Sequence, residues 1–262
     1  MRKFGIKLWS SDFTKNKDFV NAAEKLLKEG TFGYLELFAL PETYQDNQQA
    51  AMHFKDIKTI IHAPHAKQNF NPSNPEELAN NQHKLLDSQK FADLLDATII
   101  ITHPGFRDEN SGGIDENLRQ FKSFKEPRLT VENMPDYCSS THRNLEGANP
   151  QDIKRFIDET KCQFCLDFSH AICSANSHHQ DIYETLTEFN ALKPAMYHLC
   201  DGHKDSTIDA HLNYGQGNYD LKRLMLDYTS DAAMITMETD NPFPMSIQKW
   251  LNDLSYLKRL LS

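Results

Sequence analysis

The stretch Cys165-Leu166-Asp167-Phe168-Ser169-His170 places two reactive side chains at the end of an apolar, strand-like run that begins at Cys162. Asp167 ends the run, and His170 follows three residues later, where the strand pattern gives way to a loop. A carboxylate and an imidazole at this point are typical of metal ligands or of an acid–base pair, although an Asp that merely begins a turn gives the same pattern. The pattern gains weight because five other strand-like runs end in the same way.

Apolar runs alternate with amphipathic segments along the whole chain. The strand-like runs occupy residues 4–8, 34–38, 59–62, 98–103, 129–132, 163–167, 195–200 and 233–238. Patterns with the 3.6-residue period predict helices at residues 17–29, 75–95, 115–124 and 246–261, and helical patterns also follow the other strands. The 262 residues provide about 33 for each of eight units, the size of a strand–helix repeat in a barrel.

This repeat predicts an α/β fold of the (β/α)8 TIM barrel class. The alternative is a doubly wound open sheet, but no G-x-G-x-x-G follows the first strand, and the last helical pattern is placed to close a ring. No linker or low-complexity segment divides the chain, so we expect one domain over residues 1–262.

Composition excludes several classes of protein. Hydrophobic residues make up 39% and charged residues 25% of the chain, as in a soluble globular protein. Neither a signal peptide nor a membrane-spanning run is evident, so we expect a cytoplasmic protein with no membrane partner. Five cysteines are an odd number, which predicts reduced thiols. The net charge of -9 offers no general attraction for nucleic acid, and nothing in the sequence indicates the oligomeric state.

The strand ends carry the candidate site. In a barrel the carboxyl ends of all strands meet at one mouth, where active sites of this fold lie. Six strand ends and three loop positions would meet there: His62, His103, Glu132, Asp167, His170, His198, Asp209, His211 and Glu238. So many clustered carboxylates need cations to neutralise them, and imidazole with carboxylate suits Zn, Mn or Fe. Because a catalytic zinc takes about three protein ligands, the set predicts two or three ions.

These positions also match known motifs. The segments His62-Ala63-Pro64, Thr102-His103-Pro104-Gly105, Val131-Glu132-Asn133, Asp167-Phe168-Ser169-His170, His198-Leu199-Cys200-Asp201, Asp209-Ala210-His211, Gly215-Gln216-Gly217-Asn218 and Glu238-Thr239 follow one another in this order. They resemble the metal motifs of the endonuclease IV family (AP endonuclease family 2) within the xylose isomerase-like TIM barrels. The resemblance covers roughly residues 60–240, and every one of the nine ligand positions holds the expected residue type.

The resemblance implies a trinuclear zinc site. His62 and His103 would hold one zinc, which Glu132 would bridge to a second zinc bound also by Asp167, His198 and Glu238. His170, Asp209 and His211 would hold the third. Such a site suits metal-dependent hydrolysis of a phosphoester, with Glu132 and Glu238 as candidate catalytic residues and Glu238 placed to orient water or move a proton.

Two departures weaken the case for duplex DNA as substrate. The family has a basic loop after the second strand, whereas residues 37–44 here contain no arginine or lysine, and the aromatic residue expected three positions after His62 is His65. Affinity for duplex phosphates is then hard to obtain. The expected substrate is a phosphoester or a sugar-like small molecule, with DNA less favoured.

A second class of enzyme fits part of the set. Sugar isomerases and epimerases of the same superfamily hold one Mn, Co or Mg at positions that correspond to Glu132, Asp167, His198 and Glu238. That assignment leaves the remaining histidines and Asp209 without a role, so it is the alternative. An oxidative or non-enzymatic metal-binding barrel is a third and weaker choice.

Overall fold

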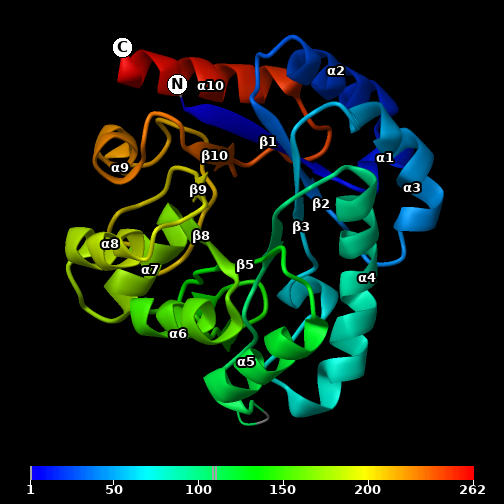
Figure 1. Ribbon diagram of the computed structural model, residues 1–262. Coiled ribbons are helices and arrows are strands. Elements are labelled where there is room, and N and C mark those ends of the chain that lie inside the picture. The colour runs from blue at the N-terminus through cyan, green and yellow to red at the C-terminus, as the bar shows by residue number, and fades with distance from the viewer. Residues whose placement is uncertain (1, 108, 110) are drawn as a thin grey trace.

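The computed structural model describes residues 2–107, 109 and 111–262. Eight parallel strands close into a barrel in which neighbours follow chain order and the last strand pairs with the first (Figure 1). They are β1 (Lys3–Trp9), β2 (Tyr34–Phe38), β3 (Thr59–His62), β4 (Ile100–Thr102), β5 (Leu129–Glu132), β8 (Gln163–Asp167), β9 (Met196–Leu199) and β10 (Met234–Met237). The predicted TIM barrel is confirmed.

Helices surround the barrel on its outside (Figure 1). They are α1 (Asp12–Lys15), α2 (Lys17–Lys28), α3 (Tyr44–Ala51), α4 (Leu78–Leu94), α5 (Gly113–Phe124), α6 (Pro150–Thr160), α7 (Phe168–Ser177), α8 (Ile182–Ala191), α9 (Leu221–Tyr228) and α10 (Ile247–Leu261). Single 3-10 turns lie at Met52–Phe54, Ala66–Gln68 and Pro75–Glu77. The last of these accounts for the start of the helix predicted over residues 75–95, and several strands are shorter at their ends than predicted.

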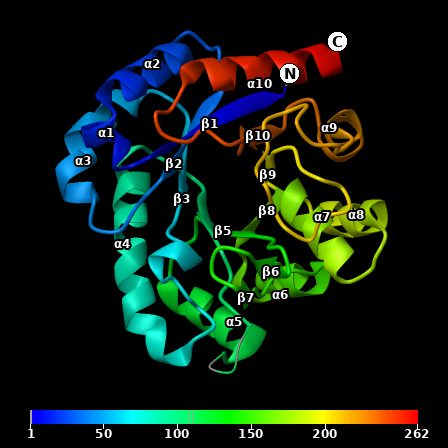
Figure 2. The same cartoon turned by 180° about the vertical axis from the view of Figure 1, so that it is seen from behind.

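A two-stranded hairpin interrupts the barrel repeat between β5 and α6. It consists of β6 (Tyr137–Cys138) and β7 (Arg143–Asn144), which pair antiparallel. In the view from behind, the hairpin is seen over α6, below β5 and β8 (Figure 2). The hydrophobic pattern of the sequence does not predict this hairpin, because two-residue strands are too short to show an alternating pattern.

Several helices begin at an Asp or Asn whose side chain accepts a backbone N–H of the first turn. These N-caps are Asn149 before α6, Asp167 before α7, Asp181 before α8 and Asp220 before α9. Such caps satisfy amide groups that have no partner within the helix. They fix the point at which each strand or loop turns into its helix.

No helix of the described residues is long and apolar enough to cross a membrane.

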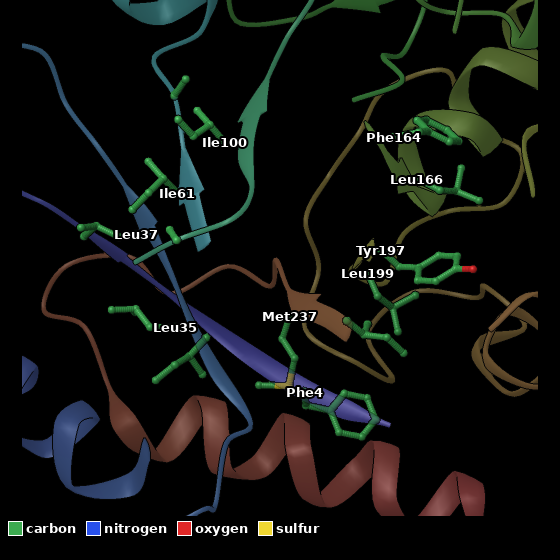
Figure 3. Close-up of a cluster of buried hydrophobic side chains, with 14 of the residues drawn as sticks. Phe4, Leu35, Leu37, Ile61, Ile100, Phe164, Leu166, Tyr197, Leu199 and Met237 are labelled. Carbon is green, nitrogen blue, oxygen red and sulfur yellow. The ribbon is translucent and has the colours of Figure 1, made fainter. Parts of the chain in front are cut away.

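Alternation along each strand divides the apolar residues into two layers. Leu35 and Leu37 of β2, Leu166 of β8 and Leu199 of β9 belong to the large cluster between the barrel and its helices (Figure 3). A smaller cluster of buried residues fills the barrel itself; its members are Tyr34, Ile60, Ile99, Ile101, Cys165, Met196 and Met234. Because successive strand residues point to opposite faces, the position after each outward leucine returns to the barrel axis.

Candidate metal centre

Several candidate ligands lie two residues beyond a member of the small apolar cluster inside the barrel, which forms the floor of the site. His62 follows Ile60 by two residues, and the same spacing separates Cys165 from Asp167 and Met196 from His198. Residues i and i+2 of a strand share a face, so each floor residue is followed by a ligand on the same side, closer to the mouth. The six strand-end residues therefore converge as predicted.

The structure brings all nine predicted side chains into three adjoining groups. The donor atoms of each group lie within 4.8 Å of one another. The groups are His62, His103 and Glu132; Glu132, Asp167, His198 and Glu238; and His170, Asp209 and His211. The chemistry of these donors fits divalent first-row metals, since neutral imidazole and carboxylate are borderline ligands. That these groups hold metal ions remains a prediction.

Glu132 belongs to two of the groups and is almost fully buried, with 1% of its surface exposed. Its Oε2 lies 3.0 Å from His103 Nε2 and 3.5 Å from His62 Nε2. Its Oε1 lies 3.1 Å from His198 Nδ1. One oxygen thus faces each group, which is the arrangement that a bridging carboxylate requires.

Asp209 is the centre of the third group. Its Oδ2 lies 3.4 Å from His170 Nε2 and 2.6 Å from His211 Nε2, and its Oδ1 accepts the hydroxyl of Ser169 at 2.6 Å. Ser169 belongs to the strand-end motif itself, so the residue directly before His170 also orients this group. The group adjoins the second one, because His211 Nδ1 lies 3.9 Å from Glu238 Oε2.

In the chain without metal, protons on the histidines and on Asp167 compensate the negative charge of the clustered carboxylates. Burial opposes charge on His170 and His211, but the neighbouring carboxylates outweigh it and raise the pKa of both imidazoles, that of His211 to about 10. The pKa of His198 is also raised against burial, by the Cys165 side chain first and then by Glu238, Glu36 and Glu132. Burial raises the pKa of Asp167 to about 7, with Glu132 and Asp209 adding to the shift. Divalent ions would supply the same compensation without these protons, as expected of metal ligands.

Two further charged residues lie in the mouth and were not predicted from the sequence. Glu36 is fully buried on β2, and Lys7 on β1 lies beside it, with Nζ 3.0 Å from Glu36 Oε1. Lys7 also pairs with Glu238. Its position in the strand could have indicated Glu36: it is the one charged residue of a buried strand, and it lies two positions after Tyr34, so both side chains point into the barrel.

A cavity of about 480 Å³ opens above the groups. Its aromatic wall consists of Trp9, 37% exposed, whose ring centroid lies 4.4 Å from that of Phe38, and of Phe38, which stacks on His62 at 4.9 Å. His65 stands where the family has an aromatic residue, and its imidazole ring stacks on that of His103 with centroids 5.1 Å apart. Burial lowers the pKa of His65 well below its usual value, which leaves a neutral wall.

Comparisons with known proteins agree with this architecture. A family model described as a xylose isomerase-like TIM barrel matches residues 24–259. A protein named probable endonuclease 4, from Pediococcus pentosaceus, is 27% identical over 183 residues, which cover 65% of this chain and 61% of that relative's length.

Two solved structures resemble the barrel over almost its whole length. Endonuclease IV from Thermus thermophilus has a TM-score of 0.68 and 20% identity, with 99% of this chain and 98% of that chain covered. A D-tagatose 3-epimerase-like protein has a TM-score of 0.72 and 19% identity, with 99% and 97% covered. At such identities the likeness shows the fold alone.

Proposed function

This chain belongs to the xylose isomerase-like TIM barrel family, and on that premise we propose that it is a metal-dependent hydrolase of small or single-stranded phosphodiesters. The nine residues of the three groups would hold two or three divalent ions, with zinc favoured over Mn or Fe. The observation that carries the proposal is the third group. A one-ion isomerase site explains Glu132, Asp167, His198 and Glu238, but gives no reason for a compact cluster of His170, Asp209 and His211 beside it.

Bound ions would supply an activated water and would neutralise charge on the leaving oxygen. The chain's own part is to hold the groups in register: Glu132 presents one oxygen to each of the first two groups. Glu238 lies at the cavity surface between His198 and His211, where it can orient a water or accept its proton.

Charge favours an anionic substrate. Four carboxylates against three divalent ions would leave a local excess of about +2. The missed pair does not alter this sum, since Lys7 and Glu36 cancel. The excess would attract a phosphodiester even though the whole protein carries a net charge of -9.

The scarcity of cationic side chains at the rim of the cavity disfavours tight binding of duplex DNA. The turn between β2 and α3, residues 39–43, contains Glu42 and no lysine or arginine. Among the described residues that line the cavity, the lysines and arginines are Lys7 and Lys67, and Lys7 is already paired. Duplex affinity depends on several phosphate contacts from cations, which this rim does not offer.

A sugar isomerase or epimerase remains the second candidate because of one observation. Glu132, Asp167, His198 and Glu238 form a complete group of their own, and Lys7 contacts Glu238 beside it. Two glutamates near a single ion could move a proton at a carbon next to a carbonyl, while the lysine faces a developing oxyanion.

One experiment separates the two candidates. A metal-replete preparation is assayed on a generic phosphodiester, on abasic duplex DNA and on a panel of ketoses, together with His211→Ala and with His203→Ala, an exposed histidine outside the groups, as the matched control. We expect phosphodiester hydrolysis that is lost in His211→Ala and kept in His203→Ala. Ketose epimerisation that survives His211→Ala, without phosphodiester turnover, would overturn the hydrolase.

A further inference from the structure

Four histidines of the candidate metal centre have a ring nitrogen tied to a fixed acceptor. Three of them use a main-chain carbonyl: Nδ1 of His62 donates to Ala63 O at 2.8 Å, Nδ1 of His170 to Asn133 O at 2.9 Å, and Nδ1 of His211 to Glu238 O at 2.8 Å. A carbonyl oxygen can only accept, so Nδ1 carries the proton and Nε2 is the nitrogen left to bind a metal ion, although Nδ1 of His170 also lies 3.4 Å from Glu132 Oε1.

His198 differs from these three histidines both in the ring nitrogen that is tied and in the kind of acceptor that ties it. Its Nδ1 faces the group, 3.1 Å from Glu132 Oε1 and 3.3 Å from Glu238 Oε1. Its Nε2 lies 3.0 Å from Oε2 of Glu36, and neither residue has any exposed surface. The acceptor that orients this histidine is therefore a side chain on β2.

We propose that Glu36 is a positioning residue that fixes His198 as a metal ligand through Nδ1, and that Lys7 balances the charge this requires. An acceptor at Nε2 keeps the proton there and leaves the Nδ1 lone pair directed at the ion. A carboxylate in this place also makes the imidazole a stronger donor. The inference rests on an ion at the Glu132, Asp167, His198 and Glu238 group, which both candidate functions require.

The surroundings of Glu36 agree with this role. Its Oε2 accepts the hydroxyl of Thr236 at 2.6 Å in addition to His198, and its Oε1 lies 3.0 Å from Lys7 Nζ. A buried carboxylate is tolerated only when its charge is paired and its oxygens are engaged. The register of β1 against β2, which sets Lys7 opposite Glu36, supplies that partner.

Glu36 could instead be a ligand, because it also forms a group with His62 and Glu238. The neighbours of its two oxygens argue against that role: a metal at Oε1, which has no hydrogen-bond partner but pairs with Lys7 Nζ at 3.0 Å, would displace the lysine, and one at Oε2 would displace His198. The two roles predict different effects on His198, which makes them separable.

The test compares graded variants at one position. Glu36→Gln keeps the shape and a neutral acceptor, Glu36→Leu removes the acceptor, and Thr236→Val is the matched control that removes another partner of Glu36 and keeps the contact between Glu36 and His198. Each purified protein is stripped of metal, titrated with Zn2+ against a competing chelator, and examined as the zinc-loaded form by NMR with 15N-labelled histidine.

We expect the affinity for one zinc ion to fall roughly 10–100-fold in Glu36→Leu, less in Glu36→Gln, and little in Thr236→Val. The His198 Nε2–H signal should weaken in the same order. Equal zinc affinity and an unchanged His198 signal in all four proteins would overturn the proposal. Loss of an ion with an unchanged His198 signal would make Glu36 a ligand and would overturn it as well.

A double variant guards against misfolding. If Glu36→Leu does not fold, Lys7→Gln combined with Glu36→Gln removes both charges of the pair and should show the same weakened zinc binding as Glu36→Gln. A double variant that binds zinc like the wild-type chain would overturn the role of the carboxylate. Because every readout is metal binding or a histidine signal, a failure to hydrolyse phosphodiesters leaves the result unaffected.

Discussion

The Oδ1 atom of Asp167 accepts the backbone N–H of His170 at 2.7 Å, so one carboxylate both caps α7 and faces the candidate metal centre. Its other oxygen, Oδ2, lies 3.9 Å from His198 Nδ1. The cap needs only a hydrogen-bond acceptor, whereas the negative charge of the carboxylate strengthens the hold on a divalent ion. The two roles of Asp167 can therefore be separated by substitution.

We predict that Asp167→Asn and Asp167→Ala differ in stability but not in metal content. Asparagine is as good an N-cap as aspartate, while alanine removes the cap at a cost of about 1 kcal/mol. Both variants lose the charge and should lose an ion. Denaturant unfolding in the presence of chelator measures the first effect and elemental analysis the second. Equal stability of the two metal-free variants would show that the cap contributes nothing.

Glu132→Gln should disable two of the groups at once. An amide presents one oxygen and no charge, so it cannot hold two cations together across Oε1 and Oε2. We expect phosphodiester hydrolysis to fall to background and at least one ion to be lost, with the fold kept. Glu188→Gln on the exposed face of α8 is the control for loss of a single negative charge. Undiminished hydrolysis in Glu132→Gln would contradict the bridging role.

Metal content should follow the groups. Mass spectrometry of the purified protein should find two to three first-row ions per chain, with zinc the most abundant. His170→Ala and His211→Ala should each contain about one ion fewer, because each removes a donor from the third group. His83→Ala, in an exposed position on α4, should keep the wild-type content. One ion or none in the wild type, unchanged by these substitutions, would favour the isomerase.

Without metal, the free energy of unfolding should decrease as the pH rises above neutral. The folded chain without metal keeps a proton on His211 up to its pKa of about 10, whereas the unfolded chain releases it near pH 6.5. Between these values the folded state binds more protons, so its stability falls as the pH rises. The raised pKa values of His170 and His198 act in the same sense.

Bound metal should reverse this trend, since metal replaces those protons and binds the folded chain far better than the unfolded one. We expect chelation to lower the melting temperature at pH 8.5 more than at pH 7, and zinc binding to release protons into weakly buffered solution. Calorimetric scans with and without a strong chelator measure the difference. An identical melting temperature after verified metal removal would argue against ions at the mouth.

Much of the barrel could be read from the chain because its signals are local. The apolar runs at residues 34–38 and 163–167 are continuous in the chain, and the helical period of residues 17–29 depends on neighbours three and four positions apart. The hairpin Tyr137–Cys138 with Arg143–Asn144 carried no such signal, since its pairing exists only once the loop folds back. The runs predicted at residues 98–103, 195–200 and 233–238 extend one or two residues beyond β4, β9 and β10, although Ala195, Ala233 and Glu238 each make a backbone hydrogen bond to a neighbouring strand.

The sequence by itself determined which residue types stand at the strand ends, because the order of His62, His103, Glu132, Asp167, His198 and Glu238 is a linear property of the chain. Only the tertiary structure decided that Glu36 and Lys7 join them, that Glu132 turns one oxygen to each of two groups, and that His198 uses its other ring nitrogen. The reason is physical: closing the barrel buries charges from different strands against one another. Which pairs form then depends on strand register and on side-chain rotation, and neither is encoded within a single segment.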